Sequence, residues 1–190
     1  MENENREKIN KMVVTAKYDM IFSFLVFVVV TLVISIMVFN GLTPIYLFFI
    51  LIPLFFLYGK IISYINIKAI KRYIEKNDLY NKMGKIEYWN EEYYLLTDNY
   101  IIIRQGKIFH FKYDEIKEIE KRTTYNLHRI STINKHIYIK LFDEKVYRIL
   151  VNTTSSVNEE YRDITDFLLA KNKNIKVIDT KKTNIKLIHK

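Results

Sequence analysis

The sequence of 190 residues contains no cysteine, only two prolines and only four glycines. Without cysteine the chain can form no disulfide, no thiolate metal site and no cysteine nucleophile. The glycines, Gly41, Gly59, Gly84 and Gly106, are too scattered along the chain to build a phosphate-cradling loop. These absences exclude several enzyme classes and leave a chain dominated by aliphatic, aromatic and basic residues.

The most informative absence is that of charge between residues 20 and 59, where no Asp, Glu, Lys, Arg or His occurs. Gly41 and its polar neighbours interrupt this stretch once, near its middle. A membrane span requires roughly 20 mostly apolar residues. We therefore expect two transmembrane helices, at residues 20–39 and 43–64, joined by a short turn. Pro53 is expected to kink the second helix.

The formal net charge of +9 is concentrated around this stretch. Basic residues precede it at Arg6, Lys8, Lys11 and Lys17, and follow it at Lys60, Lys68, Lys71, Arg72 and Lys76. Positive flanks stay on the cytoplasmic side of a membrane, so we expect both termini to be cytoplasmic. The abundance of Ile, Lys, Asn and Tyr is typical of an AT-rich bacterial genome, and hence of a bacterial inner membrane. The basic residues on either side of the charge-free stretch therefore indicate membrane topology and do not predict nucleic-acid binding.

The rest of the chain divides by composition. We expect a cytoplasmic N-terminal segment at residues 1–19, a juxtamembrane stalk at 65–80, a soluble domain at 81–179 and a basic tail at 180–190. Within residues 20–59, the expected spans contain no Asp, Glu, Lys, Arg or His. Transporters and proton relays usually need one inside the membrane, which argues against those functions.

The soluble part alternates between apolar and polar residues, as strands do. We expect strands at 85–89, 93–96, 100–104, 108–112, 117–124, 136–142 and 145–151, and a short edge strand at 175–178. One amphipathic helix is expected at 156–171, with an apolar stripe formed by Tyr161, Ile164, Phe167 and Leu168. The expected core positions of the strands are Ile101, Ile103, Ile137, Ile139, Leu141, Val146 and Ile149.

Two segments carry a family resemblance. Residues 94–103 read Tyr-Leu-Leu-Thr-Asp-Asn-Tyr-Ile-Ile-Ile, and residues 111–119 read Phe-Lys-Tyr-Asp-Glu-Ile-Lys-Glu-Ile. Together with seven strands closed by one helix, they resemble bacterial pleckstrin-homology-like (PH-like) domains, and the two preceding spans resemble the YcxB-like group of small membrane proteins. Residues 151–154 depart from the Ile-Pro-Lys-type segment of that group.

The resemblance implies an α+β fold, in which a two-helix transmembrane hairpin precedes a PH-like antiparallel β-sandwich or barrel capped by one C-terminal helix. It also implies a non-catalytic, protein-binding or scaffolding role. The resemblance supplies no catalytic residue.

No residue pattern contradicts that role. Adjacent carboxylates occur in turns or at a helix start, where solvated side chains are the rule; they are Glu91-Glu92, Asp114-Glu115, Asp143-Glu144 and Glu159-Glu160. The four histidines have no metal-ligand spacing. We therefore expect no enzyme activity, no cofactor and no metal site.

One segment could bind a ligand. Residues 121–135 contain no acidic residue but include Lys121, Arg122, Arg129 and Lys135, together with several hydroxyl side chains. Convergent cations and hydroxyls suit a phosphate or an anionic lipid headgroup. The alternative interpretation is an ordinary solvated loop.

Three functions remain open at this point. The first is a small integral membrane protein whose cytoplasmic domain binds a protein partner or a second copy of itself. The second is anionic-lipid sensing through residues 121–135. The third is an immunity-type role against a membrane-active peptide or toxin.

Overall fold

The computed structural model describes residues 1–41, 48–90, 94–126, 132–150 and 157–184. The chain divides into two compact units. The helical unit comprises Met1–Lys85, and the β unit comprises Ile86–Lys190.

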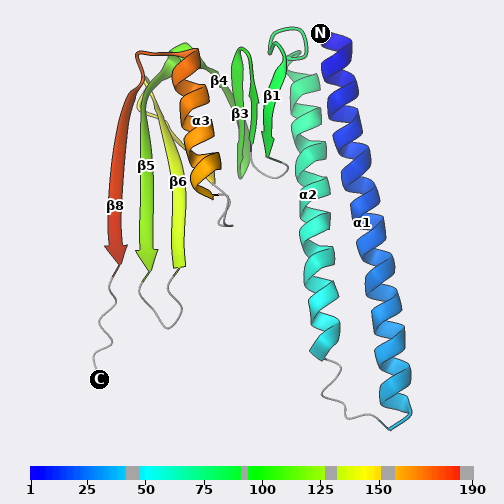
Figure 1. The fold of residues 1–190 in the computed structure, drawn as a ribbon. Helices are drawn as coiled ribbons and strands as arrows, with labels where there is room; N and C mark the ends of the chain where they lie inside the picture. The colour runs from blue at the N-terminus through cyan, green and yellow to red at the C-terminus, as the bar shows by residue number, and fades with distance from the viewer. Residues whose placement is uncertain (42–47, 91–93, 127–131, 151–156, 185–190) are drawn as a thin grey trace, which may run out of the picture. The chain divides into compact units, whose positions relative to one another are not determined.

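Two long antiparallel helices form the helical unit (Figure 1). They are α1 (Glu2–Phe39) and α2 (Leu51–Lys76). Both are long and apolar enough to cross a membrane, as the charge-free stretch predicts. Each helix also continues without a break into polar sequence. The residues predicted as a separate N-terminal segment are the first half of α1, and most of the predicted stalk is the second half of α2.

Pro53, which is predicted to kink the second helix, lies close to the point where the 3-10 turn at residues 48–50 becomes α2. Because α2 begins at Leu51, Pro53 lies in its first turn. The first N–H groups of a helix have no acceptor within that helix, so a proline there removes no hydrogen bond.

The apolar and polar halves of the hairpin differ in the exposure of their apolar side chains. The apolar half, residues 20–59, exposes most of its large side chains, including Phe22 at 69% and Phe55 at 80%. The polar half, residues 1–19 and 60–85, instead buries a set of large apolar side chains: Ile9, Ile67, Ile70, Ile74, Leu79, Tyr80 and Met83. Burial of this kind drives folding in water, whereas a large contiguous exposed apolar surface marks a site of contact with another protein or with a membrane.

An ion pair joins the two helices where the apolar half ends. Asp19 is the last charged residue before it, and Lys60 is the first after it. Lys60 Nζ lies 2.9 Å from Asp19 Oδ2, and both side chains remain partly exposed. The pair therefore aligns the ends of the two apolar segments at the same level of the hairpin.

The far end of the polar half is closed by a specific helix cap. Asp78 adopts a left-handed conformation with φ of 49°. Its N–H donates to Glu75 O at 3.2 Å, and the N–H of Leu79 donates to Ile74 O at 3.0 Å. These two bonds make a Schellman motif, which satisfies carbonyls that a helix end leaves without partners.

The start of α1 is fixed to the segment that follows this cap. Asn5, which is buried, donates from Nδ2 to Gly84 O at 2.6 Å. The guanidinium carbon of Arg6 lies 4.4 Å from the centre of the Tyr80 ring. The polar half is therefore tied together at both of its ends, by these contacts and by the Asp19–Lys60 pair.

The β unit contains two four-stranded sheets. The first sheet has the order β1-β2-β3-β4, and the second has the order β7-β6-β5-β8. The elements are β1 (Ile86–Asn90), β2 (Tyr94–Thr97), β3 (Tyr100–Gln105), β4 (Lys107–Lys112), the 3-10 helix η2 (Tyr113–Glu115), β5 (Ile116–Asn126), β6 (Thr132–Leu141), β7 (Val146–Leu150), α3 (Val157–Lys171) and β8 (Lys176–Asn184). All neighbouring strands are antiparallel except β5 and β8, which are parallel.

Most of the predicted core is confirmed. One cluster of buried side chains includes Ile101, Ile103, Ile137, Ile139, Leu141, Ile149, Ile164 and Leu168, with Phe167 packed against it. Val146 is a wrong prediction, because it is 52% exposed. Its neighbour Tyr147 pairs with Ile139 and occupies the core position instead. The side chain of Tyr161 lies outside the described part.

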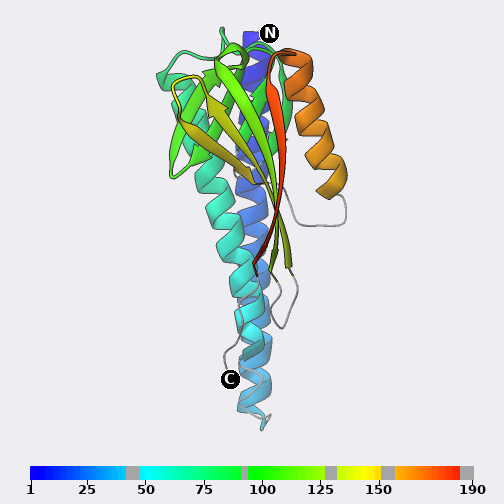
Figure 2. The same ribbon diagram turned by 90° about the vertical axis from the view of Figure 1, so that its left-hand side faces the viewer.

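The α+β class is confirmed, with two long apolar helices followed by sheets and one C-terminal helix. Two details differ from the expectation. The described strands form two separate sheets and no closed barrel. The expected edge strand is also longer, since β8 runs to Asn184 and includes the first residues of the predicted basic tail. Figures 1 and 2 both show β5, β6 and β8 extending past the N-terminal end of α3.

Candidate functional site

The predicted anion-binding segment is largely part of the second sheet. β5 continues to Asn126 and β6 begins at Thr132, so both strands enter the segment predicted as a loop. Arg129 lies outside the described residues. Three predicted site residues, Lys121, Arg122 and Lys135, therefore have described strand positions.

Lys121 and Arg122 do not converge on one ligand. They are consecutive residues of β5, and consecutive residues of a strand point to opposite faces of the sheet. Lys121 pairs in register with Ile137 of β6 and Asp179 of β8. Lys135 of β6 pairs with Thr123, which lies two residues after Lys121 on β5. By its register, Lys135 therefore belongs to the same face of the sheet as Lys121, and Arg122 belongs to the other face.

Arg122 is held by its neighbours on the outer face of the second sheet. Its Nε donates to Glu120 Oε1 at 3.0 Å, and its terminal nitrogen donates to Glu120 Oε2 at 2.7 Å. The guanidinium carbon lies 4.3 Å from the centre of the Tyr138 ring. The hydrogen bonds to Glu120 raise the pKa of Arg122. Such a bidentate pair compensates much of the charge that a ligand would need.

His136 adds no positive charge to this face at neutral pH. Its ring packs edge-on against Tyr138, with 6.1 Å between the ring centres. Burial lowers the pKa of His136, and the charges of Arg148 and Arg122 lower it further. The imidazole is therefore neutral at pH 7.

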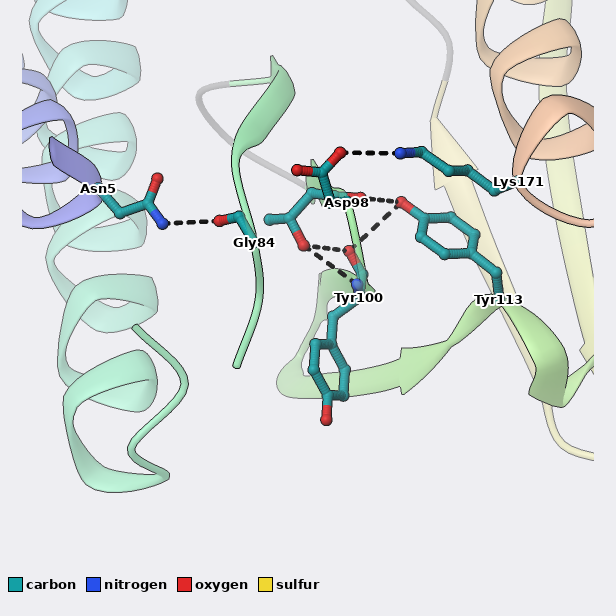
Figure 3. A network of polar contacts seen from close by, with 7 residues as sticks. Asn5, Gly84, Asp98, Tyr100, Tyr113 and Lys171 are labelled. Carbon is teal, nitrogen blue, oxygen red and sulfur yellow. Dashed lines mark hydrogen bonds and ion pairs between the residues drawn. The ribbon is translucent and has the colours of Figure 1, made fainter. Parts of the chain in front are cut away.

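Sequence reasoning missed a partly buried hydrogen-bond network in the β unit (Figure 3). The hydroxyl of Tyr113 donates to Thr97 O at 2.5 Å. The Thr97 hydroxyl accepts from the N–H of Tyr100 at 3.1 Å. Lys171 pairs with Asp98 at 2.8 Å, and Asn172 Nδ2 donates to Tyr113 O at 2.9 Å.

This network joins the β2–β3 turn, η2 and the end of α3. Burial raises the pKa of the Tyr113 hydroxyl, and the nearby Asp98 charge adds to that effect. The hydroxyl is therefore a proton donor throughout the physiological range. Its donation to a backbone carbonyl makes it a structural group, and the residues quoted for the family resemblance are accordingly residues that hold elements together.

The carboxylates of Asp143 and Glu144, at the β6–β7 turn, form ion pairs with lysines. Glu144 contacts Lys117 and Lys140, which lower its pKa to about 2. Asp143 pairs with Lys145 at 2.6 Å. Among the residues that the structure describes, no group of three or more His, Asp or Glu side chains could hold a metal ion.

No protein-family model, curated protein or solved structure matches the chain.

Proposed function

We propose that this protein is a small integral membrane protein, anchored by the apolar half of its helical hairpin. The observation that carries the proposal is the exposure of large apolar side chains between Asp19 and Lys60. Each apolar segment of about 20 residues matches the thickness of a bilayer core, at 1.5 Å per helical residue. Lipid would cover the side chains that water would otherwise contact. The basic flanks favour cytoplasmic placement of both termini, in a bacterial inner membrane.

The polar half acts as a spacer in this proposal. Both helices continue beyond the ion pair, and α2 runs from Lys60 to Lys76 before its cap. At 1.5 Å per residue, this places the cap about 24 Å from the edge of the apolar segment. The chain enters the β unit after Lys85, close to the capped end.

The β unit is proposed as a non-catalytic binding module with a PH-like layout. A four-stranded sheet, three further antiparallel strands and one helix follow in the order that the resemblance implies. The parallel strand β8 is an addition to that layout. The polar groups described above are engaged in turns, ion pairs and a buried network, which supports a scaffold that binds a protein partner or a second copy.

Alkaline carbonate extraction followed by mild detergent solubilisation tests both parts of the proposal. The full-length protein is expected to stay in the carbonate-resistant membrane fraction, and its release would refute the anchor. A stoichiometric protein that co-purifies with the full chain, but not with a control ending at Lys85, is expected for a binding module. Self-association counts equally, provided that the control is monomeric.

A further inference from the structure

The charges of the polar half are not spread evenly along its length. Because Asp19 of α1 pairs with Lys60 of α2, the twelve residues of each helix nearest to the apolar half lie at matching levels. We call these residues, 8–19 and 60–71, the collar. The remainder of the polar half contains five Lys or Arg and five Asp or Glu. The collar contains one acidic residue, Asp19, and six basic residues, which are Lys8, Lys11, Lys17, Lys60, Lys68 and Lys71.

The lysines of the collar differ in whether a carboxylate of the helical unit already pairs with them. Lys60 is paired with Asp19, and Lys71 Nζ lies 3.7 Å from Glu75 Oε1. Other lysines of the collar are exposed and form no ion pair with any residue that the structure describes; they are Lys11, Lys17 and Lys68. Their ammonium groups can therefore pair with an anion from outside the chain.

The direction of α2 turns its lysines toward the apolar half. Side chains of an α-helix lean toward its N-terminus, and α2 begins inside the apolar half, at Leu51. Lys68 shows this direction, because its Nζ lies 5.5 Å from the centre of the Tyr64 ring, about one turn closer to the apolar half. Side chains of α1 lean the other way, but Lys17 lies only two residues from Asp19. Both lysines therefore lie within about 12 Å of the boundary along the hairpin, at 1.5 Å per residue.

Exposed tyrosines mark the same level of the hairpin. Tyr58 lies two residues before Lys60 on α2 and is 62% exposed. Tyr18 lies next to Asp19 on α1 and is 67% exposed. Tyrosine is enriched at the headgroup level of membrane proteins, where its ring meets hydrocarbon and its hydroxyl meets water. Lysines, exposed tyrosines and the end of the apolar half therefore coincide.

We infer that the collar binds the headgroups of anionic phospholipids. This inference rests on the proposed membrane anchor, and it adds the class of lipid that contacts the hairpin. The headgroup layer of one leaflet is about 5–7 Å thick, and the Debye length at physiological ionic strength is about 8 Å. The collar spans about 18 Å, so most of its charge lies within this range, whereas the balanced remainder of the polar half lies beyond it. Lys17 and Lys68 supply the attraction, and their ammonium groups donate to phosphate oxygens.

The test measures which lipids contact the full-length protein. The protein is reconstituted into phosphatidylcholine bilayers that carry a trace of phosphatidylglycerol or of phosphatidylcholine with a nitroxide on one acyl chain. Electron paramagnetic resonance separates lipids held at the protein surface from free lipids, and gives the association constant of one labelled lipid relative to the other. Measurements in low and in high salt show how much of any preference is electrostatic.

We expect the wild-type protein to prefer phosphatidylglycerol by about twofold or more in low salt, and the preference to disappear in high salt. Lys17→Gln/Lys68→Gln should remove most of the preference. Lys76→Gln/Lys82→Gln removes the same charge from two exposed lysines outside the collar and should retain it, because Lys76 lies about 24 Å from Lys60 along α2. A preference that survives in Lys17→Gln/Lys68→Gln, or an equal loss in both variants, would overturn the inference.

The same spectra separate this inference from the anchor on which it rests. If neither labelled lipid shows a component held at the protein surface, lipid does not surround the hairpin, and the proposed membrane anchor itself fails. If both lipids show that component in equal amount, the anchor stands and the inference about anionic headgroups alone is overturned.

Discussion

The two halves of the helical hairpin have the same secondary structure and opposite surfaces. Ile70 in the polar half is fully buried, whereas Leu32 in the apolar half is 57% exposed. Helical propensity does not distinguish the two halves, since both are continuous parts of the same helices. In the proposed membrane anchor, the two halves differ in the solvent around them: water around the charged surface of the polar half, and hydrocarbon around the apolar half. The Asp19–Lys60 pair stands at the boundary.

The largest expected effect separates buried from exposed aliphatic residues of α1 and α2. Ile70→Ala should lower the free energy of unfolding by about 2–5 kcal/mol, because it removes buried methyl groups and leaves a cavity. Leu32→Ala should change it by less than about 0.5 kcal/mol. Denaturation of the detergent-solubilised protein, followed by circular dichroism, measures both. Equal effects at the two positions would show that the polar and apolar halves do not differ in how they bury their side chains.

Introducing a charged side chain should have the opposite order of effects, larger in the apolar half than in the polar half. Leu32→Lys places an ammonium near the middle of the first apolar segment, at a cost of about 3 kcal/mol for membrane insertion. Val14→Lys, at a partly exposed position of the polar half, should cost nothing measurable. The carbonate-resistant fraction of each variant, expressed in cells, gives the result. Undiminished insertion of Leu32→Lys would argue that this segment does not lie in hydrocarbon.

The cap of the polar half offers a stabilising change. Asp78 adopts a left-handed backbone conformation that glycine accepts without steric cost. Asp78→Gly should therefore raise the free energy of unfolding by up to about 1 kcal/mol. The lost pairing with Lys82, at 3.9 Å on the exposed surface, is worth little. Gly84→Ala is the matched control: with φ of 70° it should be destabilising. Thermal unfolding of both variants checks the pair.

The smallest effect concerns an exposed ion pair of the β unit. The pKa of Glu144 is lowered to about 2 by Lys117 and Lys140. A lowered carboxyl pKa contributes stability above its unfolded value, and this contribution is lost as the pH falls through the folded value. The stability difference between wild type and Glu144→Gln should therefore shrink from about pH 4.5 to about pH 2. A pH-independent difference would show that Glu144 does not act through its charge.

Parts of this molecule could be predicted because their signals are local. A charge-free stretch of 40 residues predicts apolar helices whatever surrounds it, and the alternation of Ile101 and Ile103 or Ile137 and Ile139 predicts core positions. Val146 was misplaced by one residue, because Val146 and Tyr147 are both suitable for a core and only the register with β6 decides between them.

The prediction of a binding loop at residues 121–135 was wrong for a reason that lies in the sequence of that segment itself. Thr123, Thr124 and Tyr125 are strand-forming residues, so the extension of β5 was readable, and with it the opposite directions of Lys121 and Arg122. The parallel pairing of β5 with β8 was not readable, because it joins segments more than 50 residues apart and depends on no short-range pattern. That pairing is what places Lys181 beside Thr123.

A single-cysteine accessibility scan along α1 shows whether the apolar half lies in a bilayer. Positions from Glu4 to Phe39 are replaced one at a time in the cysteine-free chain and exposed, in native membranes, to a water-soluble maleimide. We expect labelling up to Asp19 at water-facing positions, and protection on all sides of the helix through residues 20–39. Labelling that continues with helical periodicity beyond Asp19 would contradict the claim that the apolar half lies in a bilayer.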